Sequence, residues 1–125
     1  MIPQDYRLKK MKDFEILFKE GRFFDGGIFT AKVWKIDEKK YPRRKYLEDD
    51  LKIGLVVGLK VSKSAVKRNR LKRQMREVVR LELKDGKLKK GFMLAIIAKP
   101  SALGKDYAEI EKGITEIFRK AKLFI

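Results

Sequence analysis

The sequence contains no cysteine and no histidine. The absence of cysteine excludes disulfide bonds, thiolate metal sites and cysteine nucleophiles. The absence of histidine removes the commonest general base and the commonest metal ligand of proteins. The sequence also lacks a GxxxxGK[ST] phosphate loop, and its acidic residues lie mostly in exposed runs. We therefore predict that this chain supplies no catalytic residue and no metal ligand.

Long apolar runs are also absent. No stretch approaches the roughly 20 apolar residues of a membrane-spanning helix. The opening stretch MIPQDYRLKKMKDF lacks the apolar core of a signal peptide. These two absences predict a cytoplasmic protein without a membrane partner.

Negative charge is in the minority, with 17 Asp and Glu against 33 Lys and Arg, a formal net charge of +16. A small domain needs less charge than this for solubility, so the excess indicates a polyanionic partner. Nucleic acid is the first candidate and an anionic membrane is the second. No repeat or linker divides the 125 residues, which predicts a single domain, residues 1–125.

Hydrophobic periodicity predicts helices and strands in the order α-β-β-β-α-β-α. In the second strand, Phe29, Ala31 and Val33 share a core face and Lys32 lies on the opposite face. The strand, helix, strand passage implies a parallel pair, so we predict an α+β fold with one sheet. The first expected elements are a helix at 12–20 ended by a left-handed Gly21, a hairpin with strands at 22–24 and 28–36, and a long mobile hairpin loop at 37–50. The others are strands at 51–59 and 92–98 and helices at 64–83 and 106–122, the last capped by Asp106.

The helix at 64–83 lies within the most cationic part of the chain. Residues 60–90 hold 13 cations and 3 anions, a local excess of +10 (13 − 3) within the chain's +16. At about 100° per residue, an apolar stripe of Leu71, Met75, Val78 and Val79 faces the sheet. The opposite side is almost wholly cationic and consists of Asn69, Arg70, Lys72, Arg73, Arg76 and Arg80.

A solvated helix surface is the plain alternative, and it fits poorly. At i,i+4 spacing Lys72 meets Arg68 and Arg76, which are like-charged and mildly repulsive, and only Glu77 offers relief to Arg73 and Arg80. Arginine forks suit phosphate oxygens, and Asn69, the only asparagine, adds a donor and an acceptor. We predict nucleic-acid binding by this face; a membrane-surface helix and an acidic protein partner remain alternatives.

The stretch SAVKRNRLKRQMRE resembles the signature of the bacterial ribonuclease P protein subunit. The resemblance extends in order to RLKKMKDFEILFKEG, KIGLVV, GFMLAIIAKPSAL and IFRKAKLF, and so spans nearly the whole chain. The matching signature positions are Ala65, Val66, Arg68, Asn69, Arg70, Lys72, Arg73 and Arg76.

The resemblance implies a left-handed β-α-β crossover, against the usual right-handed rule. It also implies an endoribonuclease that matures the 5′ end of precursor tRNA, in which the RNA subunit performs the hydrolysis with bound Mg²⁺. The protein would bind no cofactor itself and would join one RNA as one copy. Its partners would be the ribonuclease P RNA and the 5′ leader of precursor tRNA, with the RNA-binding residues Lys60, Lys63, Lys67, Arg68, Asn69, Arg70, Lys72, Arg73, Arg76 and Arg80.

The family's leader cleft lies between the first helix and one sheet face. By motif, Phe14 and Phe18 form its aromatic wall, although two Phe at i,i+4 are also typical of plain core. Lys32 stands where relatives often have a tyrosine, which would replace stacking by charge. The stretch VVGLKVSKSAV lacks the usual Ser-Lys-Lys, although Lys60 and Lys63 remain there as cations.

Two other functions compete with this hypothesis. A non-enzymatic RNA-binding protein, such as a ribosomal protein, would share the charge and size but has no reason to carry DFEILFKEG or GFMLAIIAKP. A stand-alone nuclease would need a carboxylate or metal constellation that the sequence does not offer.

Overall fold

A computed structural model describes residues 2–125, except for the side chain of Gln4. The order of its elements is the predicted α-β-β-β-α-β-α. The helices are α1 (Met11–Glu20), α2 (Ala65–Lys84) and α3 (Tyr107–Lys120), the strands are β1 (Arg22–Asp25), β2 (Phe29–Lys35), β3 (Leu51–Val56) and β4 (Phe92–Ala98), and short 3₁₀ turns occur at Gln4–Tyr6, Pro42–Arg44 and Pro100–Ala102.

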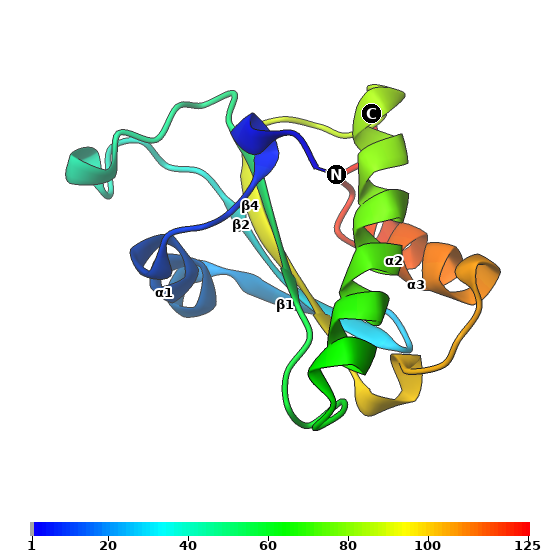
Figure 1. Cartoon of the computed structure of the whole chain (residues 1–125). Coiled ribbons are helices and arrows are strands. Elements are labelled where there is room, and N and C mark those ends of the chain that lie inside the picture. The colour runs from blue at the N-terminus through cyan, green and yellow to red at the C-terminus, as the bar shows by residue number, and fades with distance from the viewer. Residues whose placement is uncertain (1) are drawn as a thin grey trace.

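One sheet organises the molecule, with strand order β1-β2-β4-β3 (Figure 1). The β1 and β2 strands form the predicted hairpin, and β2 also pairs antiparallel with β4. The β3 and β4 strands are parallel and are joined through α2. Parallel neighbours need such a crossover connection, so the predicted parallel pair and the α+β fold class are confirmed.

The main core lies between the sheet and the two long helices. Phe29, Ala31 and Val33 of β2 are buried on this side, as alternation predicted. The apolar stripe of α2 and four side chains of α3 meet them, and burying each large apolar side chain contributes roughly 1.5–3 kcal/mol. These helix residues are Leu71, Met75, Val78, Val79, Ile110, Ile114, Ile117 and Phe118.

A second, smaller core lies on the opposite sheet face, beneath α1. Ile16 and Leu17 of α1 are buried there against Trp34, Met93 and Ala95 of the sheet. In Figure 1, α1 lies on the side of the sheet away from α2 and α3. Because α1 is only 10 residues long, it covers only one part of this face, and Tyr41 and Tyr46 cover another part at Trp34.

The end of α1 differs from the prediction. Gly21 has φ −74° and ψ 155°, which is extended backbone, so the expected left-handed terminus is wrong. A Cβ at Gly21 would lie 2.5 Å from the carbonyl oxygen of Leu17. Glycine is required here by close approach of the backbone and not by a positive φ.

The segment 37–50 also differs from the prediction. It is not a hairpin loop, because β4 lies between β2 and β3 in the sheet. Tyr41 and Tyr46 within it pack edge-on against Trp34, with ring centroids 5.9 Å and 5.7 Å away. The following strand ends at Val56 rather than Leu59, and residues 57–63 turn into α2.

Candidate nucleic-acid interface

The helix α2 begins where the sequence predicted. Ser64 is its N-cap, and the Ser64 hydroxyl accepts a hydrogen bond from the Lys67 amide at 3.3 Å. Arg68 donates to the Ser62 carbonyl at 2.9 Å and so ties the first turn to the preceding segment. The buried stripe then fixes which side of the helix faces outwards.

The predicted RNA-binding side chains lie on the outside of this helix and on the turn before it. Within residues 2–125, Arg70, Arg73 and Arg76 make no hydrogen bond or ion pair through their guanidinium groups. Cationic groups in this state are available to phosphate oxygens. The exposed members are Lys60, Lys63, Lys67, Asn69, Arg70 and Arg73, and the half-buried ones are Arg68, Lys72, Arg76 and Arg80.

Arg80 is the partly neutralised member of this set. Its guanidinium donates to both carboxylate oxygens of Glu77, at 2.7 Å and 3.1 Å. This hydrogen bond holds the pKa of Glu77 below its usual range and raises that of Arg80. Of the two arginines expected near Glu77, only Arg80 pairs with it in the described residues.

The basic side chains of α2 border two separate hollows. Lys67 and Arg70 line one, together with the turn at 103–105 that precedes α3. Lys72 and Arg76 line another, which also includes Phe14 and Gly54. The helical wheel placed these cations on one face, but it did not show that Lys72 and Arg76 reach the side of the molecule that carries α1.

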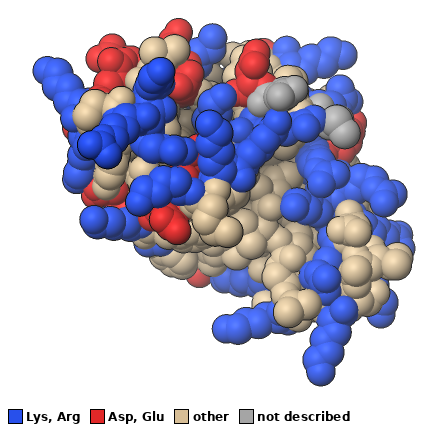
Figure 2. Space-filling model, turned by 60° about the vertical axis from the view of Figure 1, so that its left-hand side comes forward, with Lys and Arg blue, Asp and Glu red and all other residues tan. Residues whose placement is uncertain are grey.

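The open part of the sheet forms a second surface beside α1. Strand register places Phe23, Lys32, Ala95 and Gly54 in one row across all four strands, in which Ala95 and Gly54 are buried. Phe23 is 59% exposed and Lys32 is half-buried. Figure 2 shows basic side chains around an uncharged area on one side of the molecule. The hairpin alternation that placed Lys32 could also have identified Phe23, which the sequence analysis did not single out.

Phe14 and Phe18 form the edge of this surface on α1. Their rings are stacked, with centroids 6.5 Å apart and planes 21° from parallel. Phe18 is 42% exposed, whereas Phe14 is half-buried against the second core. Neither ring belongs to the fully buried core, and Phe14 serves partly as packing. We name the surface formed by Phe14, Phe18, Phe23, Lys32 and Gly54 the aromatic cleft, after the hollow that Phe14 and Gly54 line at one end of it.

Gly54 forms the floor beneath Phe14. A Cβ at this position would lie 2.7 Å from the Cζ atom of the Phe14 ring. A larger residue would therefore push the ring outwards. The sequence did not indicate a role for Gly54, because a glycine within a buried strand carries no signal of which ring lies above it.

No group of three or more Asp and Glu side chains in residues 2–125 is placed to hold a metal ion. No helix in the same part of the chain is long and apolar enough to cross a membrane.

A compact α+β domain with a cationic helix next to an exposed aromatic surface is typical of nucleic-acid-binding proteins. The sequence model of the family Ribonuclease P matches residues 2–122. The Ribonuclease P protein component of Clostridium kluyveri is 34% identical over 119 residues, which cover 95% of this chain and 96% of that protein. The corresponding protein of a Synechococcus species is 34% identical over 127 residues, covering 100% and 88%.

Solved structures agree with this match. The RNase P protein from Thermotoga maritima superposes with a TM-score of 0.72 at 25% identity, covering 91% of this chain and 96% of that one. The RNase P protein of Staphylococcus aureus has the same fold, with a TM-score of 0.76 at 24% identity and coverage of 96% and 98%. The chain belongs to the Ribonuclease P family of protein components. This membership favours the ribonuclease P hypothesis over that of a ribosomal protein.

Proposed function

We propose that this chain binds the ribonuclease P RNA through α2 and the 5′ leader of precursor tRNA through the aromatic cleft. In doing so it promotes endonucleolytic maturation of the tRNA 5′ end in the cytoplasm, as one protein per RNA. The observation that carries the proposal is the cationic face of α2, where Arg70, Arg73 and Arg76 have no partner among residues 2–125, beside the aromatic cleft in a member of this family.

Charge and geometry support the assignment of α2 to a folded RNA. Residues 65–84 of α2 hold 8 cations and 2 anions, an excess of +6 (8 − 2) on a rigid helix. Its arginine forks match phosphate oxygens. Its two bordering hollows let Lys67 and Arg70 on one flank and Lys72 and Arg76 on the other contact different phosphates. Binding through such contacts releases counterions and is therefore strongly salt-dependent.

The aromatic cleft suits a single strand. Exposed rings such as Phe18 and Phe23 can stack on bases of any sequence. Lys32 lies on β2, between β1 and β4, and adds a cation for the phosphate backbone of the single-stranded RNA. Because Lys72 and Arg76 line a hollow together with Phe14, a leader in the cleft would lie next to the RNA bound by α2.

The acids of the chain support a division of labour in which the RNA subunit, with bound Mg²⁺, performs the hydrolysis. Glu20, Asp25, Glu77 and Glu116 each accept a hydrogen bond from a Lys or Arg side chain, which holds the pKa of each carboxylate below its usual value. Carboxylates held in such pairs are poorly suited to act as a general base, since a cation lowers their basicity.

The purified protein, free of RNA, is expected to leave precursor tRNA intact at every Mg²⁺ concentration. Added to a bacterial ribonuclease P RNA, it should restore cleavage at the mature 5′ end at low Mg²⁺, where that RNA alone is inactive. The measurement is a gel assay of the 5′ leader released. Cleavage by the RNA-free protein, or no gain from adding it to the RNA, would contradict the proposal.

Gly54→Ala is expected to weaken binding of precursor tRNA to the reconstituted holoenzyme while sparing mature tRNA. The new Cβ would meet the outer atoms of the Phe14 ring, so the ring must move and the cleft changes shape. Overpacking of this kind costs about 1 kcal/mol of folding stability or somewhat more. Gly58→Ala is the matched control, because nothing lies within 4 Å of a Cβ there. Equal effects of the two substitutions would contradict the prediction.

A further inference from the structure

The segment 37–50, which we call the latch segment, contacts both ends of the helix α1. Arg44 and Tyr46 reach Asp13 in the first turn of α1. Lys40 and Tyr41 reach Glu20, the last residue of α1. Neither the family match nor the proposed function assigns a role to this segment.

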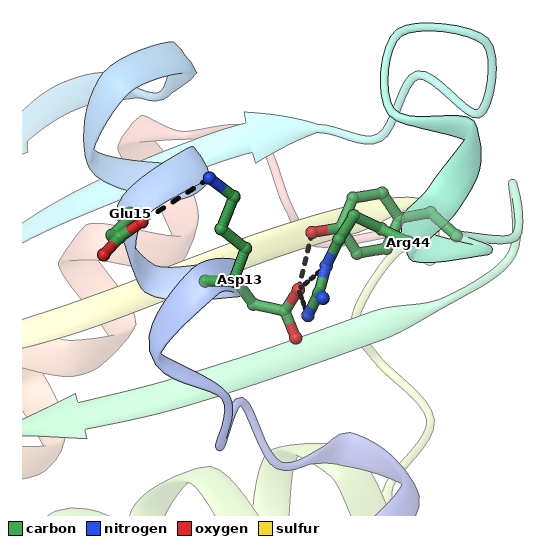
Figure 3. A network of polar contacts seen from close by, with 5 residues as sticks. Asp13, Glu15 and Arg44 are labelled. Carbon is green, nitrogen blue, oxygen red and sulfur yellow. Dashed lines mark hydrogen bonds and ion pairs between the residues drawn. The ribbon is translucent and has the colours of Figure 1, made fainter.

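The contacts at Asp13 converge on one atom. Arg44 donates from Nε at 3.1 Å and from Nη2 at 2.7 Å to Oδ1 of Asp13, and the Tyr46 hydroxyl donates to the same oxygen at 2.6 Å (Figure 3). Asp13 and Arg44 keep only 15% and 25% of their side-chain exposure, so solvent screens this pair less than a surface pair. Burial and the bond to Asp13 raise the pKa of Tyr46 to about 12, so its hydroxyl keeps its proton as a donor.

The contacts at Glu20 repeat the arrangement at the other end of the helix. Lys40 lies 2.7 Å from Oε2 of Glu20, and the Tyr41 hydroxyl donates to that oxygen at 2.9 Å. The bond from Lys40 holds the pKa of Glu20 below its usual value. Lysine and tyrosine thus pair with a carboxylate at this end, as arginine and tyrosine do at the other.

The latch segment is itself fixed to the sheet. The rings of Tyr41 and Tyr46 pack edge-on against Trp34 of β2. Trp34 and Tyr46 are both buried, at 8% and 9% exposure. The same two tyrosines therefore contact the sheet through their rings and α1 through their hydroxyl groups.

The helical geometry links these contacts to the cleft. Asp13 and Glu20 are seven residues apart and lie within about 20° of each other around the axis. Phe14 and Phe18 lie about 100–140° further round. Only Ile16 and Leu17 of α1 are buried, so apolar packing alone resists rotation of this short helix weakly. A rotation that breaks the bonds at Asp13 would move both rings relative to Gly54 and Lys32.

We propose that the latch segment sets the rotation of α1, and that Asp13, Arg44 and Tyr46 are positioning residues for leader recognition. The proposal rests on the proposed function of the aromatic cleft. None of the three residues needs to touch RNA for this role.

Three variants of different charge test the proposal in the holoenzyme reconstituted with ribonuclease P RNA. Asp13→Ala, Tyr46→Phe and Arg44→Gln change the net charge by +1, 0 and −1. Each is expected to weaken binding of precursor tRNA roughly 3- to 10-fold, without an equal loss for mature tRNA. Asp13→Ala is the decisive variant, because removal of an acid should strengthen RNA binding if charge alone mattered.

Glu15→Ala is the matched control for Asp13→Ala. Glu15 lies on the same helix and carries the same charge, but its side chain is exposed and its ion pair with Lys12, at 3.7 Å, is exposed as well. Its removal should leave selectivity for precursor tRNA unchanged. Trp34, the only tryptophan, supplies a spectroscopic readout: its emission should move to longer wavelength in Arg44→Gln and Tyr46→Phe while the helix content stays constant.

Two results would overturn the proposal while leaving the cleft assignment intact. In the first, affinity for precursor tRNA follows net charge, with a gain for Asp13→Ala and a loss for Arg44→Gln. That result would mean that the latch segment contacts phosphates directly. The other is unchanged precursor binding in all three variants while Phe18→Ala still discriminates precursor from mature tRNA. If Phe18→Ala and Phe14→Ala weaken binding of precursor and mature tRNA equally, the aromatic cleft does not bind the leader. This proposal would then be wrong as well.

Discussion

The triple variant Arg70→Gln, Arg73→Gln, Arg76→Gln is expected to lose about 100-fold or more in affinity for ribonuclease P RNA. Each guanidinium is unpaired in the described residues and would contribute about 1 kcal/mol or more through a charged hydrogen bond. The fold should persist, because the three side chains lie opposite the buried stripe of α2 and glutamine is a good helix former. Equilibrium binding and thermal melting measure the two effects.

Salt dependence separates specific contacts from diffuse charge. Loss of three phosphate contacts should reduce the slope of log affinity against log salt by about 2–3 units. Lys84→Gln, Lys89→Gln, Lys90→Gln is the matched control: it removes the same charge from exposed residues at and beyond the far end of α2. A loss of the same size in the control would mean that the RNA is held by overall charge and not by this face.

The features that sequence analysis predicted depend on neighbours along the chain. The α2 helix was predicted with its buried stripe because an i,i+3,i+4 pattern is complete within one segment. The β4 strand matched its predicted bounds, and Asp106 caps α3 by accepting from the Glu109 amide at 2.9 Å. Local patterns of this kind also predicted which cations lie on the outside of α2.

The features that were missed depend on contacts distant in sequence. The row that joins Phe23 to Lys32, Ala95 and Gly54 follows from strand order, and no single segment shows that β4 lies between β2 and β3. The segment 37–50 has no apolar period, so its two tyrosines gave no sign that they contact Trp34 on one side and α1 on the other. The composition of that segment predicted a mobile loop, whereas its contacts are those of an anchored one.

Phe18→Ala and Phe14→Ala are expected to weaken binding of precursor tRNA to the holoenzyme and to spare mature tRNA, because only the precursor has a leader. Loss of a base stack costs about 1–3 kcal/mol, which corresponds to roughly 5- to 150-fold in affinity. Phe18 is 42% exposed, so its removal should change the melting temperature little. Phe14 packs partly on the second core, and its removal should cost more stability.

Two further variants serve as a control and as a test of charge. Tyr107→Ala removes a similarly exposed ring, 39% exposed, from α3 on the other side of the sheet, and it should leave both ligands unaffected. Lys32→Ala should act like the phenylalanine variants, but with a deficit that shrinks at high salt because its contact is ionic. Binding of both tRNAs by each variant at two salt concentrations therefore separates stacking, charge and folding. Equal losses for precursor and mature tRNA, or a collapse of the melting temperature in both phenylalanine variants, would show that these rings support the fold and that the leader binds elsewhere.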